Sequence, residues 1–172
     1  MAEQIPPGTS ESHGDTHTLR FVVPLPHPEE RVWLALTTPG GLRGWLAGTE
    51  VIQGRLGGEI TLRWLNTDPP HVVSGTVTAW DVERIVEYTV EVHGRMRFHL
   101  ETGGGPGACV LRFTNEFRGT DELRLDCLAG WHDHFLYLAD SLDGRPADWP
   151  SWSRERWQEL RDQYEARDFG AT

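Results

Sequence analysis

The sequence contains no lysine, so its 16 basic residues are all arginines. Lysine forms the Schiff bases of covalent catalysis and binds phosphate in P-loops, and both kinds of chemistry are therefore excluded. The 26 acidic residues give a formal net charge of −10, and the arginines are spread from Arg20 to Arg167 without forming a run. Surfaces that follow a phosphate backbone or an anionic membrane need clustered positive charge. We therefore expect no nucleic acid and no membrane among the partners.

Cysteine is nearly absent as well. Cys109 and Cys127 are the two present, and neither belongs to a CxxC pair, so the sequence predicts neither a disulfide framework nor a thiolate zinc site. Long apolar runs are also missing: none approaches the roughly 20 residues that cross a bilayer, and the first residues lack the basic and apolar regions of a secretory signal. These absences predict a cytoplasmic protein without membrane insertion.

The length of 172 residues is that of one domain with short appendages. Residues 1–15 are rich in proline, glycine, serine and acidic residues, which predicts a disordered N-terminal tail. Residues 16–144 are expected to form the folded domain. Residues 145–172 are predicted to be a tryptophan-rich C-terminal extension, with a helix from Ser153 to Arg167.

Apolar and polar residues alternate in a series of short segments, which is typical of strands in an antiparallel sheet with one solvated face. These segments lie at about residues 16–23, 59–64, 73–79, 86–92, 96–101 and 109–117. Two short helices are predicted between His27 and Leu46, and one long helix from Asp121 to Asp143. The long helix has an apolar stripe, and the sheet is the only large apolar surface against which it could pack. The expected fold class is α+β.

Several local patterns resemble a known family. Near the start stands Val32-Trp33-x-Ala35-Leu36-Thr37-x-Pro39-x-x-Leu42-x-x-Trp45, followed later by Gly57-Gly58, Gly75-x-Val77 and Gly130-Trp131. Together with the order of elements, they resemble the START-like (SRPBCC) superfamily, and within it the homologues of the activator of the Hsp-ninety ATPase. The resemblance spans about residues 17–144. It implies a helix-grip fold, in which a curved antiparallel sheet wraps around a long C-terminal helix.

The resemblance also implies a cavity between the sheet and the long helix. The residues expected to line it are Trp45, Trp64, Tyr88, Met96, Phe98, Phe113, Asn115, Trp131, His134 and Phe135. An aromatic wall with few polar groups suits an apolar or aromatic small molecule. Tyr88 and Asn115 are the polar exceptions, and we expect the pocket to reach them. The alternative for each aromatic residue is ordinary core packing.

Catalytic and metal-binding signals are weak. Residues two apart on a helix project about 200° from each other, so His132 and His134 are not expected to share a metal ion, and no cofactor site is predicted. His134 is a weak candidate for a general base.

The main hypothesis for the function is a non-enzymatic binding domain for an apolar small molecule, and the second is an enzyme of the polyketide cyclase type. The third is a chaperone-cofactor-like or other interaction module, in which Trp149, Trp152 and Trp157 contact a protein partner or a second copy of the chain.

Overall fold

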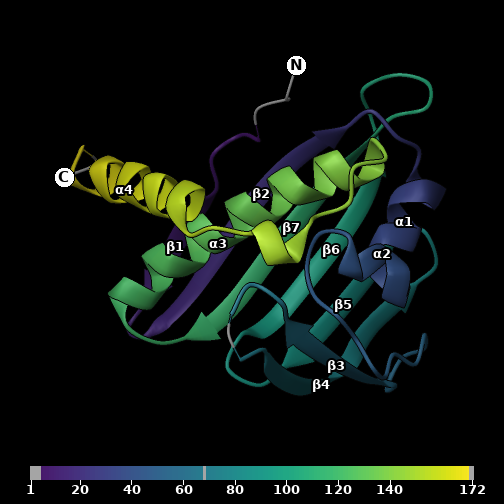
Figure 1. The fold of residues 1–172 in the computed structure, drawn as a ribbon, viewed down its shortest axis with the longest axis horizontal. Helices are drawn as coiled ribbons and strands as arrows, with labels where there is room; N and C mark the ends of the chain where they lie inside the picture. Colours follow the sequence, from purple (N-terminus) through teal and green to yellow (C-terminus); the bar gives the residue numbers. More distant parts are fainter. Residues whose placement is uncertain (1–4, 68, 171–172) are drawn as a thin grey trace.

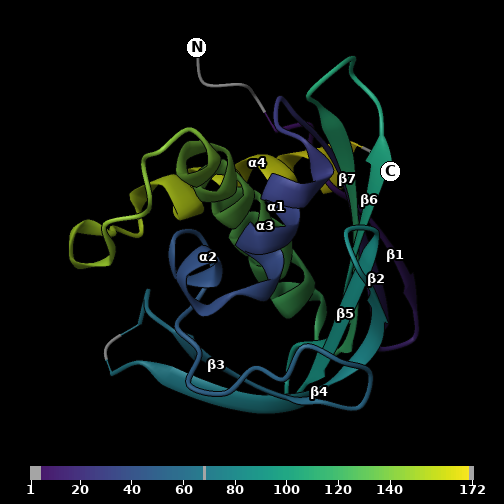
Figure 2. The same cartoon turned by 90° about the vertical axis from the view of Figure 1, so that its right-hand side faces the viewer.

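The fold is a curved antiparallel sheet that encloses a long helix on its concave side (Figures 1 and 2). The computed structural model describes residues 5–67 and 69–170. The sheet has seven strands in the order β1-β2-β7-β6-β5-β4-β3. The strands are β1 (Thr9–His13), β2 (Thr16–Leu25), β3 (Glu59–Trp64), β4 (His71–Asp81), β5 (Ile85–Val90), β6 (Gly94–Thr102) and β7 (Cys109–Arg118).

Threonine side chains cap the N-termini of two of the helices. The helices are α1 (Glu29–Thr37), α2 (Pro39–Arg43), α3 (Asp121–Leu142), a short 3₁₀ helix (Trp149–Ser151) and α4 (Glu155–Gly170). The Thr120 hydroxyl accepts the N–H of Leu123 and caps α3, as the Thr38 hydroxyl does for α2. Within the described ranges, no helix is both long and apolar enough to cross a membrane. The predicted α+β helix-grip fold is confirmed.

The centre of the interface between α3 and the sheet is filled by aromatic rings. The ring centroids of Phe113 and Trp131 are 4.3 Å apart, and those of Phe98 and Phe113 are 4.9 Å apart. Phe135 stacks on Trp45 at 5.9 Å. These contacts are those of a close-packed interior. Any ligand cavity must therefore lie beside this core, not within it.

The prediction of a disordered tail over residues 1–15 is wrong for Thr9–His13. These residues form β1, which pairs antiparallel with the first half of β2. Strand β1 is polar and largely exposed, so it lacks the apolar alternation that identifies a half-buried strand. Its backbone hydrogen bonds to the edge of β2 require no apolar side chain. Residues 1–4, also part of that prediction, lie outside the described residues.

The turn between β5 and β6 contains one residue in an unfavourable backbone conformation. Val92 has a φ of 67° and a side chain that is 65% exposed. A left-handed conformation costs an L residue roughly 1–2 kcal/mol, and β-branched residues adopt it least readily. We expect Val92→Asn to raise the free energy of unfolding by about 1 kcal/mol, because asparagine tolerates this region.

Denaturant unfolding measures this change, and Val82→Asn is the matched control. Val82 is an exposed valine of the β4–β5 turn without a positive φ. An equal gain in both variants would point to the removal of an exposed apolar side chain, and would contradict the explanation by backbone strain.

Candidate ligand pocket

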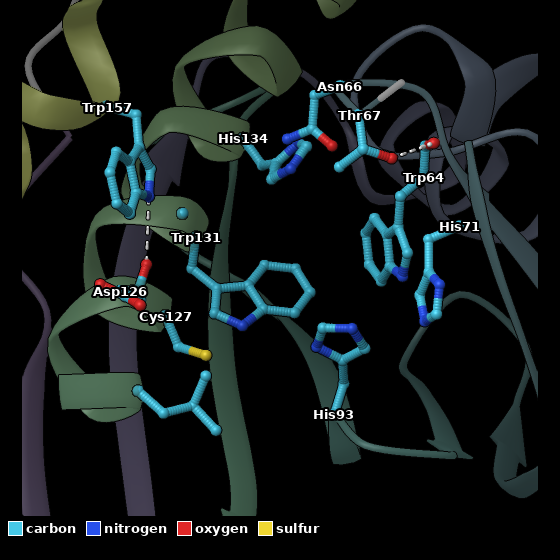
Figure 3. Close-up of a pocket in the computed structure, with 12 residues that line it drawn as sticks. Trp64, Asn66, Thr67, His71, His93, Asp126, Cys127, Trp131, His134 and Trp157 are labelled. Carbon is cyan, nitrogen blue, oxygen red and sulfur yellow. Dashed lines mark hydrogen bonds between the residues drawn. The ribbon is translucent and has the colours of Figure 1, made fainter. Parts of the chain in front are cut away.

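A cavity of about 330 Å³ lies beside the aromatic core, at the end of the sheet where β3, β4 and the β5–β6 turn meet the first half of α3 (Figure 3). The first part of α4 closes one side. The lining residues are Trp64, Asn66, Thr67, His71, His93, Leu123, Asp126, Cys127, Gly130, Trp131, His134 and Trp157. The volume falls within the range of small-molecule sites, roughly 300–1,000 Å³.

Three indole rings form the apolar walls. Figure 3 shows Trp131 and Trp64 on opposite sides of the cavity, with Trp157 next to Trp131. Trp131 donates its Nε1–H to Asn115 Oδ1 at 3.0 Å, and Trp157 donates its own to the carbonyl oxygen of Asp126 at 3.2 Å. Because these hydrogen bonds orient two of the three rings, the apolar walls are already formed in this structure.

Asn115 lies outside the cavity lining but forms hydrogen bonds with residues that line it. Its Nδ2 donates to the carbonyl oxygens of His93 at 2.8 Å and Arg95 at 2.9 Å, while its Oδ1 accepts from Trp131. The amide is fully buried and uses both donor hydrogens within the protein. Asn115 therefore positions the β5–β6 turn and the Trp131 ring relative to each other.

His134 presents a neutral imidazole to the cavity. Its Nδ1 lies 2.8 Å from the carbonyl oxygen of Trp45, and because a carbonyl can only accept, Nδ1 carries the hydrogen. Burial lowers the pKa of His134 below its usual value. Nε2 has no hydrogen bond with the described residues and is not a fully covered atom. In the neutral ring this nitrogen is an acceptor available to a ligand.

The nitrogen atoms of Trp64 and His93 lie at the end of the cavity opposite His134. The centroids of these two rings are 4.9 Å apart. Burial, assisted by the charges of His71 and His134, lowers the pKa of His93 to about 4, so its ring is neutral at pH 7. The Nε1 atom of Trp64 is buried and has no hydrogen-bond partner among the described residues. Buried donors without a partner are rare, because each costs about 1–3 kcal/mol.

Gly130 lies in the middle of α3 and lines the cavity. A Cβ atom at this position would meet only Trp157 Nε1, at 3.8 Å, which is an ordinary contact. Glycine inside a helix costs about 1 kcal/mol relative to alanine, and here packing does not require it. Because Gly130 has no side chain, this cavity and an adjoining one of about 340 Å³ both stay open. The lining of the adjoining cavity also includes Asp133, Trp152 and Arg154.

Of the ten residues predicted to line the pocket, Trp64, Trp131 and His134 do so. The expectation that the pocket reaches Tyr88 and Asn115 is not met. The hydroxyl of Tyr88 donates to the carbonyl oxygen of Leu36 at 2.7 Å, and the side chain of Asn115 forms its hydrogen bonds with His93, Arg95 and Trp131. The others are also core residues outside the cavity: Trp45, Met96, Phe98, Phe113 and Phe135.

The tryptophans of the C-terminal extension contact their own chain. Trp149 donates its Nε1–H to the carbonyl oxygen of Arg43 at 2.7 Å, and Trp152 donates to Asp133 Oδ2 at 3.3 Å. Trp157, with its bond to Asp126, is a wall of the cavity. The extension therefore docks on the helix-grip domain beside α3 (Figure 1). The interaction hypothesis rested on the acidic surface and on these three indoles, and the contacts of the indoles with their own chain weaken its second part.

His132 and His134 point to different partners. His132 Nδ1 lies 2.7 Å from the hydroxyl of Tyr164, whereas His134 contacts the carbonyl of Trp45. In the part of the chain that the structure describes, no group of three histidine, cysteine or acidic side chains could hold a metal ion. The cavity offers hydrogen bonds and apolar surface to a ligand.

Sequence alone did not place most of the polar groups in the lining. His93 lies in a turn, and Asn66, Thr67 and His71 surround the β3–β4 connection, so no periodicity assigns them to a face. One signal was available at Gly130, because a glycine in the middle of an amphipathic helix marks a place where space or close approach is needed.

The curved sheet, the enclosed helix and the cavity beside it define a START-like helix-grip protein. The family model of Activator of Hsp90 ATPase homolog 1-like proteins matches residues 26–143, and the chain belongs to this family. The match ends before the extension that carries Trp157. No curated protein shows a significant sequence match to the chain.

Several solved structures share the fold. The chain is similar to EF2215 of Enterococcus faecalis, a conserved protein of unknown function, with a TM-score of 0.72 at 15% identity over 96% of this chain and 92% of that one. CalU16 of Micromonospora echinospora gives a TM-score of 0.66 at 14% identity over 92% and 94% of the two chains. DynU16, a protein of the dynemicin biosynthetic locus, gives 0.60 at 20% identity over 75% and 48%. Identities this low establish the fold alone.

Proposed function

We propose that the protein binds an uncharged apolar or aromatic small molecule in the cavity between Trp64, Trp131 and Trp157. The observation that carries the proposal is this cavity of about 330 Å³, whose walls are indole rings and whose polar atoms lie at its two ends. Flat apolar walls with a few polar groups are typical of small-molecule sites.

The electrostatics of the cavity favour a neutral ligand. Asp126, the acidic residue in the lining, is paired with Arg161 Nε at 2.6 Å. In the adjoining cavity Asp133 is paired with Arg156 Nε at 2.5 Å. His93 and His134 are neutral at pH 7 because burial lowers the pKa of each. Within the cavity of about 330 Å³, a ligand with a net charge would lose its hydration without gaining an unpaired opposite charge from Asp126, His93 or His134.

The test uses two fluorescent probes with the same ring skeleton. N-Phenyl-1-naphthylamine is neutral, and 8-anilinonaphthalene-1-sulfonate adds one sulfonate. We expect saturable binding of the neutral probe, and binding of the sulfonate that is at least tenfold weaker, about 1.4 kcal/mol or more. Absence of saturable binding by the neutral probe would overturn the proposal.

Gly130 supplies matched variants for the same titration. Gly130→Leu places a branched side chain in the cavity and is expected to weaken binding of the neutral probe at least 30-fold, about 2 kcal/mol. Gly130→Ala adds one methyl group and is expected to change binding less than fivefold, about 1 kcal/mol, while stabilising α3. If Gly130→Leu bound the probe as wild type does, the site would lie elsewhere.

A second candidate function, an enzyme of the polyketide cyclase type, is favoured by the orientation of His134. The Trp45 carbonyl fixes its tautomer, so the Nε2 lone pair can accept a proton from a bound molecule. DynU16, a protein of the same fold, belongs to a biosynthetic locus.

The assay for this activity is the exchange of the methyl protons of 2-acetylnaphthalene with deuterium from D₂O, followed by NMR. Catalysed exchange that disappears in His134→Gln while binding persists would support the enzyme, and exchange at the rate of buffer alone would exclude it for this probe.

A further inference from the structure

The corner formed by Trp64, His71 and His93 has a feature that apolar binding does not explain. The Trp64 indole is 8% exposed, and its Nε1–H is a buried donor without a partner among the described residues. The nitrogen edge of this indole is turned towards His71, with His93 nearby (Figure 3). The other two indoles of the cavity, Trp131 and Trp157, both donate to protein oxygens. Trp64 is thus the one indole of the cavity whose donor is unused.

The imidazole beside this donor is also unsatisfied. The ring nitrogens of His93 form no hydrogen bond with residues 5–67 or 69–170, and neither is fully covered. The backbone, in contrast, is held firmly, because the His93 carbonyl accepts from Asn115 Nδ2 and the His93 N–H donates to the Glu91 carbonyl at 2.7 Å. The preceding residue, Val92, adopts its costly positive φ in the same turn. Backbone strain of this kind is concentrated at functional sites.

Access to the Trp64 donor requires the His71 ring to move aside, because the nitrogen edge of the indole is turned towards it. His71 is exposed, and its ring makes no hydrogen bond with the described residues that a rotation would break. The nitrogen edge of Trp64 and the His93 ring lie at the same corner of the lining, so an atom that takes the place of the His71 ring lies near both. A neutral imidazole can donate through one ring nitrogen. Two neighbouring N–H groups are suited to an oxygen with two lone pairs.

We infer that the ligand carries a carbonyl oxygen, which accepts a hydrogen bond from Trp64 Nε1–H in the corner beside His93. The inference rests on the proposed function, since it names a group of the same ligand. The aromatic body of that ligand lies between Trp64 and Trp131, and the oxygen saturates the donor that the protein leaves free. A hydrocarbon of equal shape would fill the cavity and leave the donor unpaired.

Three isosteric probes test this inference by displacement of N-phenyl-1-naphthylamine: 2-isopropylnaphthalene, 2-acetylnaphthalene and 2-naphthoate. The quantity to measure is the ratio of dissociation constants between an oxygen-bearing probe and the hydrocarbon, determined in wild type and in variants. The comparison between proteins cancels differences in the hydration of the free probes.

In Trp64→Phe we expect this ratio to change by about tenfold against 2-acetylnaphthalene, the size of one neutral hydrogen bond. 2-Naphthoate carries a charged carboxylate and is expected to bind wild type more weakly than 2-acetylnaphthalene, because the cavity favours a neutral ligand. Trp157→Phe is the matched control, since Trp157 is another indole of the cavity but its N–H is already used by Asp126. It should weaken all three probes in parallel and leave the ratio within twofold.

An unchanged ratio for 2-acetylnaphthalene in Trp64→Phe, with this probe and the hydrocarbon still bound, would overturn the inference and leave the proposed function intact. If none of the probes displaced N-phenyl-1-naphthylamine and that dye itself failed to bind wild type, the proposed function would fail first. Should Trp64→Phe not fold, the ¹H–¹⁵N spectrum of wild type decides. The indole N–H of Trp64 should move downfield with 2-acetylnaphthalene and not with 2-isopropylnaphthalene, and equal responses would refute the hydrogen bond.

Discussion

Replacement of Asn115 by alanine is expected to lower the free energy of unfolding by about 3 kcal/mol. The substitution removes the partner of the Trp131 Nε1–H and of the carbonyl oxygens of His93 and Arg95, all in a region where Asn115 is fully buried. Each buried polar group left unpaired costs about 1–3 kcal/mol, and water has little space to replace the amide. Urea unfolding followed by tryptophan fluorescence gives the difference directly.

Asn66→Ala is the control for this measurement. Asn66 lines the cavity but its side chain forms no hydrogen bond with the described residues, so its removal should change the unfolding free energy by less than about 0.5 kcal/mol. Because Asn115 positions both Trp131 and His93, Asn115→Ala should also weaken binding of N-phenyl-1-naphthylamine. A stability change below about 1 kcal/mol would mean that the neighbouring groups find other partners.

The elements of the fold were predictable because their apolar periodicity is strong. The long helix was expected over Asp121 to Asp143 and is observed over Asp121–Leu142, and the alternating segments became the strands of the curved sheet. Alternation assigns a side chain to a face of the sheet, and this was sufficient for the architecture. It failed for β1 (Thr9–His13), which is held by backbone hydrogen bonds at a polar edge.

The position of the cavity was not predictable from the same pattern. Periodicity says which side chains point inward, but not how far apart the two layers lie at each point. Phe98, Phe113 and Phe135 fill the centre, where helix and sheet are in contact. The open space lies where α3 passes the β3–β4 connection, and it is closed by Trp157 from a segment beyond the family match. Loop residues and a docked extension carry no periodic signal of their partners.

Acidification from pH 7 to pH 4 is expected to lower the free energy of unfolding by about 3 kcal/mol through His93 and His132 together. Burial is the main cause that lowers the pKa of each to about 4 in the folded protein, from a usual value of 6.5. The charges of His71 and His134 act in the same direction on His93, and those of Arg167 and Arg156 on His132, where Asp133 opposes them.

The direction follows from which state binds protons. As the pH falls below about 6.5, the unfolded chain protonates these histidines and the folded chain does not, so stability decreases. The decrease from these residues levels off near pH 4, where the folded protein takes up the same protons. A full shift would contribute about 3 kcal/mol per histidine, and we halve this because both rings retain some solvent contact. Hydrogen bonds from Thr78, Arg97 and Arg95 hold the pKa of Glu87 below its usual value despite burial, so Glu87 adds to the decline only below about pH 5, where the unfolded carboxylate takes up a proton.

The variant His132→Gln separates this effect from general acid sensitivity. Glutamine keeps a polar group near the Tyr164 hydroxyl, which His132 Nδ1 contacts at 2.7 Å, but it does not titrate. We expect a smaller stability at pH 7 and a decline towards pH 4 that is reduced by about 1.5 kcal/mol, half of the total. Urea unfolding at intervals between pH 7 and pH 4 measures both. An equal decline in His132→Gln and wild type would show that this histidine is protonated in the folded state, and that its buried position between α3 and α4 opens to water more readily than its contact with Tyr164 implies.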